Sequence, residues 1–308
     1  MGGHGCVVAE RPATDTWDTG GVSTPHPSYV FLKGHGTEND FVLLPDHDGS
    51  VHGGLSVDRV RALCDRRAGI GGDGVLRVIR TASLLSLVGE GALRLPRDQG
   101  TTDDLPEWFM DYRNADGGAA EMCGNGIRVF ARHLVDEGLV PADGPIPIAT
   151  RAGVKIVSRD GELWTADLGP ASVLGETKVS IDDRSWPATH VVVGNPHAVV
   201  VVDDLAEAGH LYDEPAYDTG LFPGGVNIEF VARRGPDHIA MRVHERGSGE
   251  TRSCGTGACA AAIAVAPGGP GDWRVDVSGG TLRVSRDGEG RVSLTGPAVI
   301  VARGETDL

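Results

Sequence analysis

The segment CGNG at residues 123–126 is matched by CGTG at residues 254–257, which lies 131 residues further along the chain. An alanine follows eight residues after each cysteine, at Ala131 and Ala262. The separation is close to half of the 308-residue chain, a length at which one core usually divides into two domains. The repeated segment therefore predicts two similar domains, each presenting one cysteine.

Both segments lie where a helix is expected to begin. After the first, apolar residues spaced three and four apart (Ile127, Phe130 and Leu134) predict a helix over residues 124–137. After the second, a run of alanine and other apolar residues predicts a buried helix over residues 255–266. Each cysteine is therefore expected at the N-terminus of a helix.

The composition indicates an acidic globular protein of the α/β or α+β class. The chain has 28 Lys and Arg against 43 Asp and Glu, a formal net charge of −15, which disfavours binding to nucleic acid. Its most apolar stretch, residues 191–202, is interrupted by the polar segment GNPH, so no membrane span is expected. The first residues do not resemble a secretory signal, and five cysteines do not form a disulfide framework, so we expect a cytoplasmic protein.

Two cysteines at helix N-termini favour acid–base chemistry at a carbon atom. The free N–H groups and the positive end of the helix dipole favour the thiolate form of such a cysteine. Two thiols that face each other across a cleft can invert a stereocentre, because one removes a proton from one face and the other delivers a proton to the opposite face. The same helix N-termini can donate hydrogen bonds to a substrate carboxylate. The pattern therefore predicts a racemase or epimerase that uses no cofactor.

Other chemistries have weaker support in the sequence. Residues 69–74 contain glycines in an order similar to phosphate-binding loops, but no Lys-Ser/Thr follows and no acidic residue is clearly placed for a ribose. None of the three lysines has the context of a Schiff base to pyridoxal phosphate. No Cys-x-x-Cys pair suggests a zinc site. We therefore predict neither a cofactor nor a metal ion.

Further polar motifs surround the two cysteines, and their combination is highly specific. They are HGTENDFV at 35–42, DRRAGIGGDGV at 65–75, NADGGAAEMCGNGIR at 114–128, GNPHAV at 194–199, VNIEFV at 226–231 and HERGSGETRSCGTGACA at 244–260. With these motifs the sequence resembles the diaminopimelate epimerase family over about residues 31–304. Gly34 and Glu38 depart from the family, which often has a hydrophobic residue near the first position and glycine near the second.

The resemblance implies an α/β (α+β) fold of two similar lobes, each a mixed sheet wrapped around a central helix, with the active site in the cleft between them. It also implies a homodimer. The expected boundaries are an N-terminal extension at 1–27, disordered or loosely attached; an N-terminal lobe at 28–168 with an insertion at about 81–106, completed by 298–308; and a C-terminal lobe at 169–297.

The family's activity would be the interconversion of LL- and meso-2,6-diaminopimelate without cofactor or metal, in the synthesis of lysine and peptidoglycan precursors. By resemblance, Cys123 would be the base that acts on the LL isomer and Cys254 the acid that protonates the opposite face, with the roles exchanged in reverse. His197 would support Cys123, and Glu245 would support Cys254. Cys64 and Cys259 are interpreted as structural.

The resemblance also implies a set of residues that bind the substrate. The backbone of the helix N-termini would hold the reacting carboxylate, and asparagines with an acidic and a basic side chain would bind chiefly the distal amino-acid end. These residues are Gly124, Asn125, Gly255 and Thr256 at the helix ends, and Asn39, Asn114, Asn195, Asn227, Glu245 and Arg246 around them. Asp73 stands apart from this set, at a loop position where some family members have a polar residue that contacts the substrate.

Two alternatives stay open at this stage. A related paired-cysteine enzyme, such as a proline or hydroxyproline racemase, would use the same chemistry, but a cyclic imino acid offers no second ammonium and carboxylate to Glu245 and Arg246. An inactive amino-acid-binding module would need no pair of acid–base thiols. Taken singly, His197, Arg246 and the asparagines are also typical of turns, cores and surface ion pairs.

Overall fold

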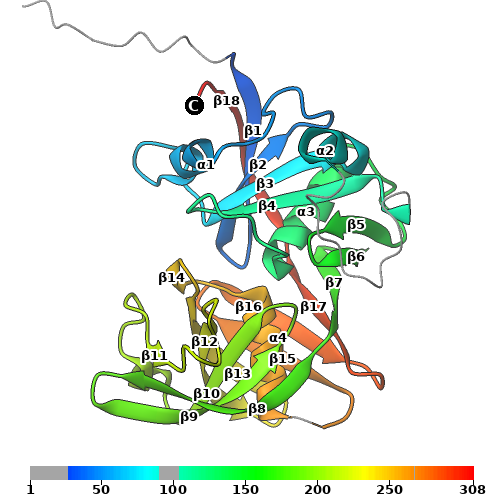
Figure 1. The fold of residues 1–308 in the computed structure, drawn as a ribbon. Helices are drawn as coiled ribbons and strands as arrows, with labels where there is room; N and C mark the ends of the chain where they lie inside the picture. The colour runs from blue at the N-terminus through cyan, green and yellow to red at the C-terminus, as the bar shows by residue number, and fades with distance from the viewer. Residues whose placement is uncertain (1–26, 90–103, 267) are drawn as a thin grey trace, which may run out of the picture.

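The computed structural model describes residues 27–89, 104–266 and 268–308. These residues form two lobes, which lie one above the other in Figure 1. Residues 1–26 of the expected N-terminal extension and residues 90–103 of the expected insertion lie outside the described residues. The first part of the expected insertion is a helix, α2 (Thr81–Val88).

The upper lobe contains a mixed sheet and three helices. Its last strand comes from the C-terminal end of the chain and pairs antiparallel with the first strand. The helices are α1 (Val57–Cys64), α2 and α3 (Gly124–Asp136). The strands are β1 (Tyr29–Gly36), β2 (Asn39–Pro45), β3 (Gly74–Arg80), β4 (Trp108–Asn114), β5 (Ile146–Thr150), β6 (Gly153–Asp160), β7 (Leu163–Pro170) and β18 (Val299–Thr306).

The lower lobe contains the remaining strands and one long helix. The helix is α4 (Gly255–Val265), and a short 3-10 helix, η3 (Leu205–Ala208), follows one of the strands. The strands are β8 (Ser172–Ile181), β9 (Arg184–Val192), β10 (Pro196–Val202), β11 (Ala216–Tyr217), β12 (Asn227–Gly235), β13 (His238–Glu245), β14 (Gly249–Thr251), β15 (Gly271–Val277), β16 (Gly280–Arg286) and β17 (Arg291–Pro297).

The two lobes repeat the same order of strand pairings. In the upper lobe the order is β18–β1–β2–β3–β4–β5–β6–β7, in which β2–β3 and β4–β5 are parallel and the other pairs antiparallel. In the lower lobe it is β8–β9–β10–β12–β13–β15–β16–β17, in which β10–β12 and β13–β15 are parallel at the equivalent places. Helix α3 lies between β4 and β5 in the sequence, and α4 lies between the equivalent strands β13 and β15. The repeat seen in the sequence therefore extends to the topology.

Strands β7 and β17 join the lobes. They pair antiparallel from Leu163 to Pro170 against Arg291 to Pro297, and both run between the lobes in Figure 1. The chain passes to the lower lobe after β7 and returns to the upper lobe after β17. The two lobes are therefore connected twice, and the sheet is continuous across the connection.

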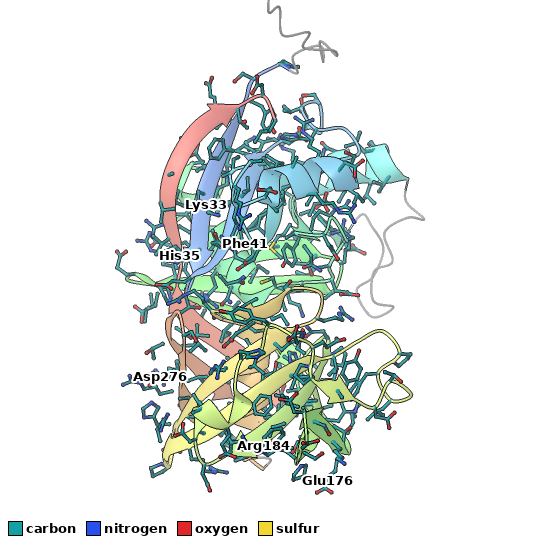
Figure 2. All side chains as sticks on the ribbon, turned by 90° about the vertical axis from the view of Figure 1, so that its left-hand side faces the viewer. Lys33, His35, Phe41, Glu176, Arg184 and Asp276 are labelled. Atoms are coloured by element: carbon teal, nitrogen blue, oxygen red, sulfur yellow. The ribbon has the colours of Figure 1, made fainter. Side chains whose placement is uncertain are left out.

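A continuous core surrounds the two central helices. Phe130 of α3 and Ile263 of α4 are fully buried and belong to the same apolar cluster, together with strand residues of both lobes. Figure 2 shows Phe41 inside the upper lobe, whereas Glu176 lies at the lower end of the molecule and is exposed. Helix α3 has a polar side, because Arg132 and Asp136 pair at its surface, while α4 is apolar on all sides. Each lobe thus wraps a sheet around one helix.

The structure confirms the predicted fold class and both predicted helices. Helix α3 ends at Asp136 and α4 ends at Val265, each one residue before the expected end. The domain boundaries stay a prediction. Cys64 and Cys259 are buried free thiols. Within residues 27–89, 104–266 and 268–308, no helix has the length and apolar character needed to cross a membrane.

Candidate active site

The N-termini of α3 and α4 meet at the boundary between the lobes. A Cβ atom on Gly255 would lie 3.0 Å from the backbone N of Asn125 and 3.1 Å from the carbonyl carbon of Gly124. A Cβ atom on Gly124 would lie 3.0 Å from Leu294 Cδ2 and 3.5 Å from the backbone of Gly255. Glycine at both positions therefore allows the two backbones to touch, which brings the free N–H groups of both helices to one place.

Both cysteines cap their helices in the same way. Cys123 Sγ accepts a hydrogen bond from Gly126 N at 3.3 Å, and Cys254 Sγ accepts one from Gly257 N at 3.4 Å. The backbone of each cysteine is extended, as is typical of an N-cap residue. The predicted position of both thiols at helix N-termini is therefore confirmed.

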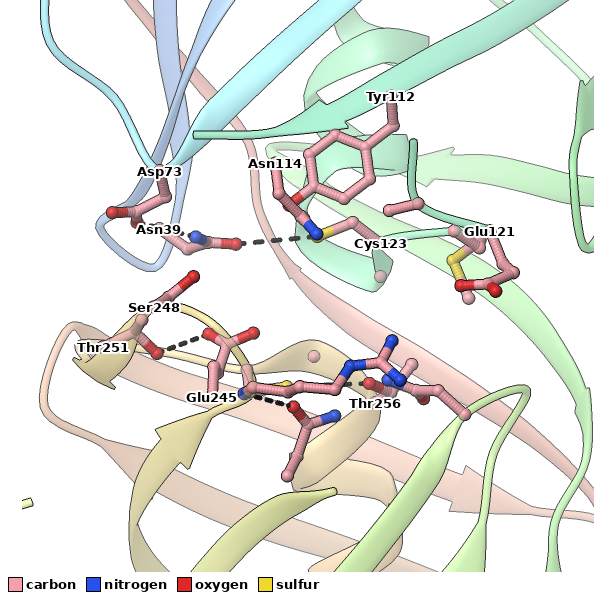
Figure 3. Close-up of a pocket in the computed structure, with 18 residues that line it drawn as sticks. Asn39, Asp73, Tyr112, Asn114, Glu121, Cys123, Glu245, Ser248, Thr251 and Thr256 are labelled. Atoms are coloured by element: carbon pink, nitrogen blue, oxygen red, sulfur yellow. Dashed lines mark hydrogen bonds between the residues drawn. The ribbon is translucent and has the colours of Figure 1, made fainter. Parts of the chain in front are cut away.

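A cleft between the lobes contains both thiols (Figure 3). Its walls come from β4 and α3 of the upper lobe and from β13, β14 and α4 of the lower lobe. Most residues predicted from the sequence line it: Asn39, Asp73, Asn114, Cys123, Gly124, Asn195, Asn227, Glu245, Arg246, Cys254, Gly255 and Thr256. Asn125 and His197 are not among the lining residues.

Asn39 joins Cys123 to an acidic loop. Its Oδ1 accepts a hydrogen bond from Cys123 Sγ at 3.6 Å, and its Nδ2 donates to Asp73 Oδ2 at 2.8 Å. The other oxygen of Asp73 accepts from Arg66 at 2.7 Å. Asp73 therefore lines the cleft and also orients Asn39, whose amide oxygen faces the thiol.

Glu245 occupies the lower wall of the cleft beside Cys254. Thr251 Oγ1 donates a hydrogen bond to Glu245 Oε1. Burial raises the pKa of Glu245 from its ordinary value of 4.5 to about 7, although the hydrogen bonds from Thr251 and Cys254 favour the ionised form. A carboxyl group with this pKa can exchange a proton with the neighbouring thiol near neutral pH.

Arg246 follows Glu245 and lies at the exposed edge of the cleft. Its backbone N donates to Asn227 Oδ1 at 3.0 Å, and its Nη1 donates to the carbonyl oxygen of Gly224 at 2.9 Å. The remaining N–H groups of the guanidinium can bind a carboxylate that enters from solvent. Asn227 thus fixes the backbone that carries the predicted carboxylate-binding side chain.

The side chain of Asn125 is buried behind the helix ends. Its Nδ2 donates to Asn39 Oδ1 at 3.2 Å and to the carbonyl oxygen of Ser253 at 3.1 Å. Its Oδ1 accepts from Arg128 Nη2 at 2.8 Å. Only the backbone of Asn125 is therefore available to a substrate carboxylate. Its side chain connects Asn39, which accepts a hydrogen bond from Cys123, with Ser253, which precedes Cys254.

His197 has different neighbours from those expected. It is fully buried on β10, its Nδ1 bonds Glu229 Oε1 at 2.7 Å, and its Nε2 bonds Asn195 Oδ1 at 2.9 Å. Glu229 packs on the first turn of α4, because a Cβ on Gly257 would lie 2.6 Å from its Oε1. In the described part of the chain His197 makes no hydrogen bond to Cys123, so its contacts lead toward Asn195 and the helix of Cys254 instead.

The turn between β1 and β2 explains one departure from the family. Thr37 and Glu38 have φ angles of 50° and 60°, in the left-handed region that favours glycine. Thr37 Oγ1 nevertheless bonds Ser253 Oγ at 2.7 Å, and Glu38 forms an ion pair with Arg252. Both turn residues therefore bind the segment that leads into Cys254 and tie the lobes together beside the cleft.

The sequence analysis missed several residues that line the cleft. Ala120, Glu121, Met122, Ser248 and Thr251 lie inside the motifs that surround the two cysteines, so proximity in sequence could have identified them. Tyr112 lies outside every motif, and only the structure brings it to the cleft.

Burial outweighs the helix N-terminus in setting the pKa of each thiol. Burial raises the pKa of Cys123 to about 12, while the N–H groups of Gly126 and Asn125 act in the opposite direction. Burial, followed by the charges of Glu245 and Glu229, raises the pKa of Cys254 well above its ordinary value. The helix effect predicted from the sequence is therefore present at Cys123 and Cys254, but the effect of burial on the pKa of each thiol is larger.

Across the residues that the structure describes, no three His, Cys, Asp or Glu side chains are grouped in a way that could hold a metal ion. The polar groups of the cleft are instead amides, carboxyls, thiols, one guanidinium and free backbone N–H groups. This set matches the functional groups of an amino-acid zwitterion.

Comparison with known structures supports the same fold. A hydroxyproline epimerase from Agrobacterium vitis superposes with a TM-score of 0.61 at 14% identity, covering 91% of this chain and 92% of that chain. A phenazine biosynthesis protein of the PhzF family from Bacillus anthracis has a TM-score of 0.59 at 16% identity, covering 91% and 99%. At these identities the likeness concerns the fold alone.

Sequence comparison identifies the family. The sequence profile of a family described as diaminopimelate epimerase matches residues 31–174 and 189–301. The diaminopimelate epimerase of Streptomyces coelicolor is 52% identical over 90% of this chain and 95% of its own length. That of Thermobifida fusca is 48% identical over 90% of this chain and 98% of its own length. The chain therefore belongs to the diaminopimelate epimerase family, a family of isomerases.

Proposed function

We propose that this protein interconverts LL- and meso-2,6-diaminopimelate, in the synthesis of lysine and peptidoglycan precursors. The observation that carries the proposal is the pair of capping cysteines, Cys123 and Cys254, on two helices that meet at their N-termini and share one cleft. Inversion at a carbon atom needs one group on each face of the substrate. Two thiols supply both groups without a cofactor.

In the direction from the LL isomer, the Cys123 thiolate would take the α-proton and form a thiol. The electron pair left on the α-carbon would then take a proton from the Cys254 thiol on the opposite face, which leaves Cys254 as the thiolate. The reverse reaction exchanges the two roles. Before the next turnover in this direction, the Cys123 thiol would release its proton to solvent. Glu245 would return a proton to Cys254, which its pKa of about 7 allows near neutral pH.

The reacting carboxylate would lie between the two helix ends. The backbone N–H groups of Gly124, Asn125, Gly255 and Thr256 would stabilise the negative charge that grows as the proton leaves. Arg246 would bind the distal carboxylate, and Asn39, Asn114, Asn195 and Asn227 would bind or orient the rest of the substrate. We assign His197 an indirect role through Asn195 and Glu229, since these are its hydrogen-bond partners.

Proton NMR in deuterated water tests this function. Reduced protein is mixed with LL-diaminopimelate, and the α-proton signal is followed together with the ratio of LL to meso isomer. We expect the α-proton signal to decrease while meso product that carries deuterium accumulates. Folded, reduced protein that neither exchanges this proton nor forms meso product would refute the proposal.

The same assay separates the alternatives. Proline and hydroxyproline are assayed in parallel, and exchange of their α-protons without exchange on diaminopimelate would assign the protein to the paired-cysteine racemases. Saturable binding of diaminopimelate without any exchange would instead indicate an amino-acid-binding module. We expect exchange with diaminopimelate only, because Glu245 and Arg246 match a second ammonium and carboxylate.

We further propose that the protein acts in the cytoplasm as a homodimer. Support comes from the family, whose reaction belongs to cytoplasmic precursor synthesis, and from the acidic net charge of −15. Size-exclusion chromatography with light scattering measures the mass in solution, for which we expect twice the 32.1 kDa of one chain.

A further inference from the structure

Tyr112 lies in the wall of the cleft and takes no part in the mechanism above. It belongs to β4, two residues before Asn114, so both side chains point to the same face of the strand. Its ring extends from β4 toward the cleft in Figure 3, and the residue is 8% exposed. Tyr112 therefore lies where the core of the upper lobe meets the candidate active site.

Packing fixes the direction of the Tyr112 ring. The ring meets Phe41 edge to face, with centroids 5.9 Å apart and planes at 83°. A Cβ atom on Gly74 of the neighbouring strand would lie 2.7 Å from Tyr112 Cε2. Glycine at position 74 therefore leaves the space that the ring occupies.

The hydroxyl group of Tyr112 has no hydrogen-bond partner among the described residues. Among the residues that the structure describes, none donates a hydrogen bond to it or accepts one from it. Tyr29, a second buried tyrosine, donates to the carbonyl oxygen of Leu308 at 2.7 Å. Tyr112 Oη is not among the buried polar atoms that lack a partner, and Tyr112 lines the cleft, so the hydroxyl is open to a molecule bound there. Phenylalanine would fill the same space without offering this donor.

The surroundings of this hydroxyl keep it protonated. Burial raises its pKa well above the ordinary value, and Cys123, Glu245, Asp73 and Cys254 act in the same direction. The phenol therefore remains protonated throughout the working pH range. A protonated phenol donates its strongest hydrogen bond to an anionic oxygen.

We propose that Tyr112 is a substrate-binding residue whose hydroxyl donates a hydrogen bond to a carboxylate oxygen of the amino acid bound in the cleft. The proposal rests on the proposed function, because it takes the occupant of the cleft to be diaminopimelate. It adds a donor to those supplied by the helix ends and Arg246. It also gives Gly74 a role, since the absence of a side chain there positions the ring.

Replacement of Tyr112 by phenylalanine removes only the hydroxyl and tests the proposal. We expect Tyr112→Phe to raise KM for LL-diaminopimelate about 10-fold, the loss of one hydrogen bond to a charged group, and to leave kcat within about 2-fold. Substrate protection of Cys123 against alkylation should need about 10-fold more diaminopimelate. The matched control is Tyr29→Phe, which loses a hydrogen bond far from the cleft and should change neither value.

A measurement on the wild-type protein does not depend on the folding of a variant. The chain has four tyrosines, so protein labelled with carbon-13 at tyrosine Cζ gives at most four signals. We expect diaminopimelate to shift the signal of Tyr112. This signal is assigned as the one that is missing from Tyr112→Phe. If that variant does not fold, it is the signal that remains in each variant when Tyr29, Tyr212 and Tyr217 are replaced in turn.

The outcomes separate this inference from the proposed function. If wild-type protein does not act on diaminopimelate, the proposed function fails. If wild-type protein is active, but Tyr112→Phe keeps the same KM and the same protection, or no tyrosine signal shifts on binding, only the role of Tyr112 is overturned. A fall in kcat at constant KM would also overturn it, because that result assigns the hydroxyl to proton transfer instead of binding.

Discussion

The first turns of α3 and α4 share one geometry but lie in different surroundings. In both, a cysteine sulfur accepts a hydrogen bond from the N–H group three residues later, at 3.3 and 3.4 Å. Cys123 then donates to an amide oxygen, that of Asn39, which cannot take up a proton. Cys254 lies beside the carboxyl group of Glu245, which can. The repeat therefore supplies two equivalent thiols, and residues outside the repeat give them different proton partners.

This difference suits a reaction that needs one thiol and one thiolate at a time. Two identical environments would favour neither thiol as the one that loses its proton. The carboxyl group beside Cys254 and the neutral amide beside Cys123 make the two thiols unequal. We infer that the acid–base asymmetry of the site comes from Asn39 and Glu245, whereas its geometric symmetry comes from the two helices.

Loss of either thiol should have the largest effect. We expect Cys123→Ser and Cys254→Ser each to lower kcat about 10³-fold, because serine is a far weaker acid than cysteine and cannot exchange the proton at neutral pH. The LL-to-meso conversion followed by NMR measures this. Cys259→Ser, which changes a buried thiol on the same helix as Cys254 but outside the cleft, is the control and should keep most of the activity.

Near-normal turnover in either cysteine variant would show that the two thiols are not a functional pair. A double variant sharpens the comparison further. If both thiols act in one step, Cys123→Ser combined with Cys254→Ser should be hardly worse than either change alone.

Removal of the carboxyl group beside Cys254 should have the next largest effect. We expect Glu245→Gln to lower kcat/KM from the LL isomer about 10- to 100-fold and to remove the fall in activity as pH increases through about 7, the pKa above which Glu245 has lost the proton that it returns to Cys254. Asn39→Asp provides the matched change, because it gives Cys123 a carboxyl group as well. A pH profile with the same limb in Glu245→Gln would mean that another group titrates there.

Glu245→Gln should also stabilise the fold at alkaline pH. Because burial raises the pKa of Glu245 from 4.5 to about 7, the native protein holds a proton in this window that the unfolded chain has released. The free energy of unfolding therefore falls as pH rises from about 4.5 to about 7, and the whole decrease is present above pH 7. Thermal unfolding of Glu245→Gln should show a higher Tm than wild type at pH 8 and a smaller difference at pH 5.

The sequence was sufficient for the features that the repeat carries. The glycine after each cysteine, the apolar spacing of Ile127, Phe130 and Leu134, and the alanine run of α4 are local patterns, and local patterns determine where a helix begins. The asparagines of the cleft were predicted from the resemblance to the family, whose motifs contain them. These features needed no knowledge of how distant strands pair.

The features that sequence reasoning missed depend on tertiary packing. Tyr112 reaches the cleft only because Gly74, on the neighbouring strand, has no side chain. His197 was expected to support Cys123, but it lies on β10 of the lower lobe and bonds Glu229 of the neighbouring strand β12. Glu38 looked like a departure from the family, and its partner Arg252 lies 214 residues away. Contacts between segments so far apart leave no periodic signal in a single sequence.

The contact between the two helix ends can be tested by adding one methyl group. We expect Gly255→Ala to destabilise the protein by about 1–3 kcal/mol, since its Cβ would lie 3.0 Å from Asn125 N and 3.1 Å from the Gly124 carbonyl carbon. Urea unfolding measures the difference. Gly268→Ala is the control, because a Cβ there meets nothing within 4 Å. Equal stability of the two variants would mean that the helix ends are further apart.

The two lobes should also differ in their response to acid, the smallest effect that we expect. Burial lowers the pKa of His133, in the upper lobe, to about 4, and neither of its ring nitrogens has a hydrogen-bond partner in the described part of the chain. The unfolded chain takes up a proton below about pH 6.5 that the native protein does not, so stability is complete above that pH and falls toward pH 4. Between pH 7.5 and pH 5 this histidine alone should lower the free energy of unfolding by about 1–2 kcal/mol, and His133→Leu should abolish this decrease. Urea unfolding at both pH values measures this difference. The control is His210→Asn, which changes an exposed histidine of the lower lobe. If His133→Leu keeps the pH dependence of the wild-type protein, the acid sensitivity lies elsewhere in the molecule.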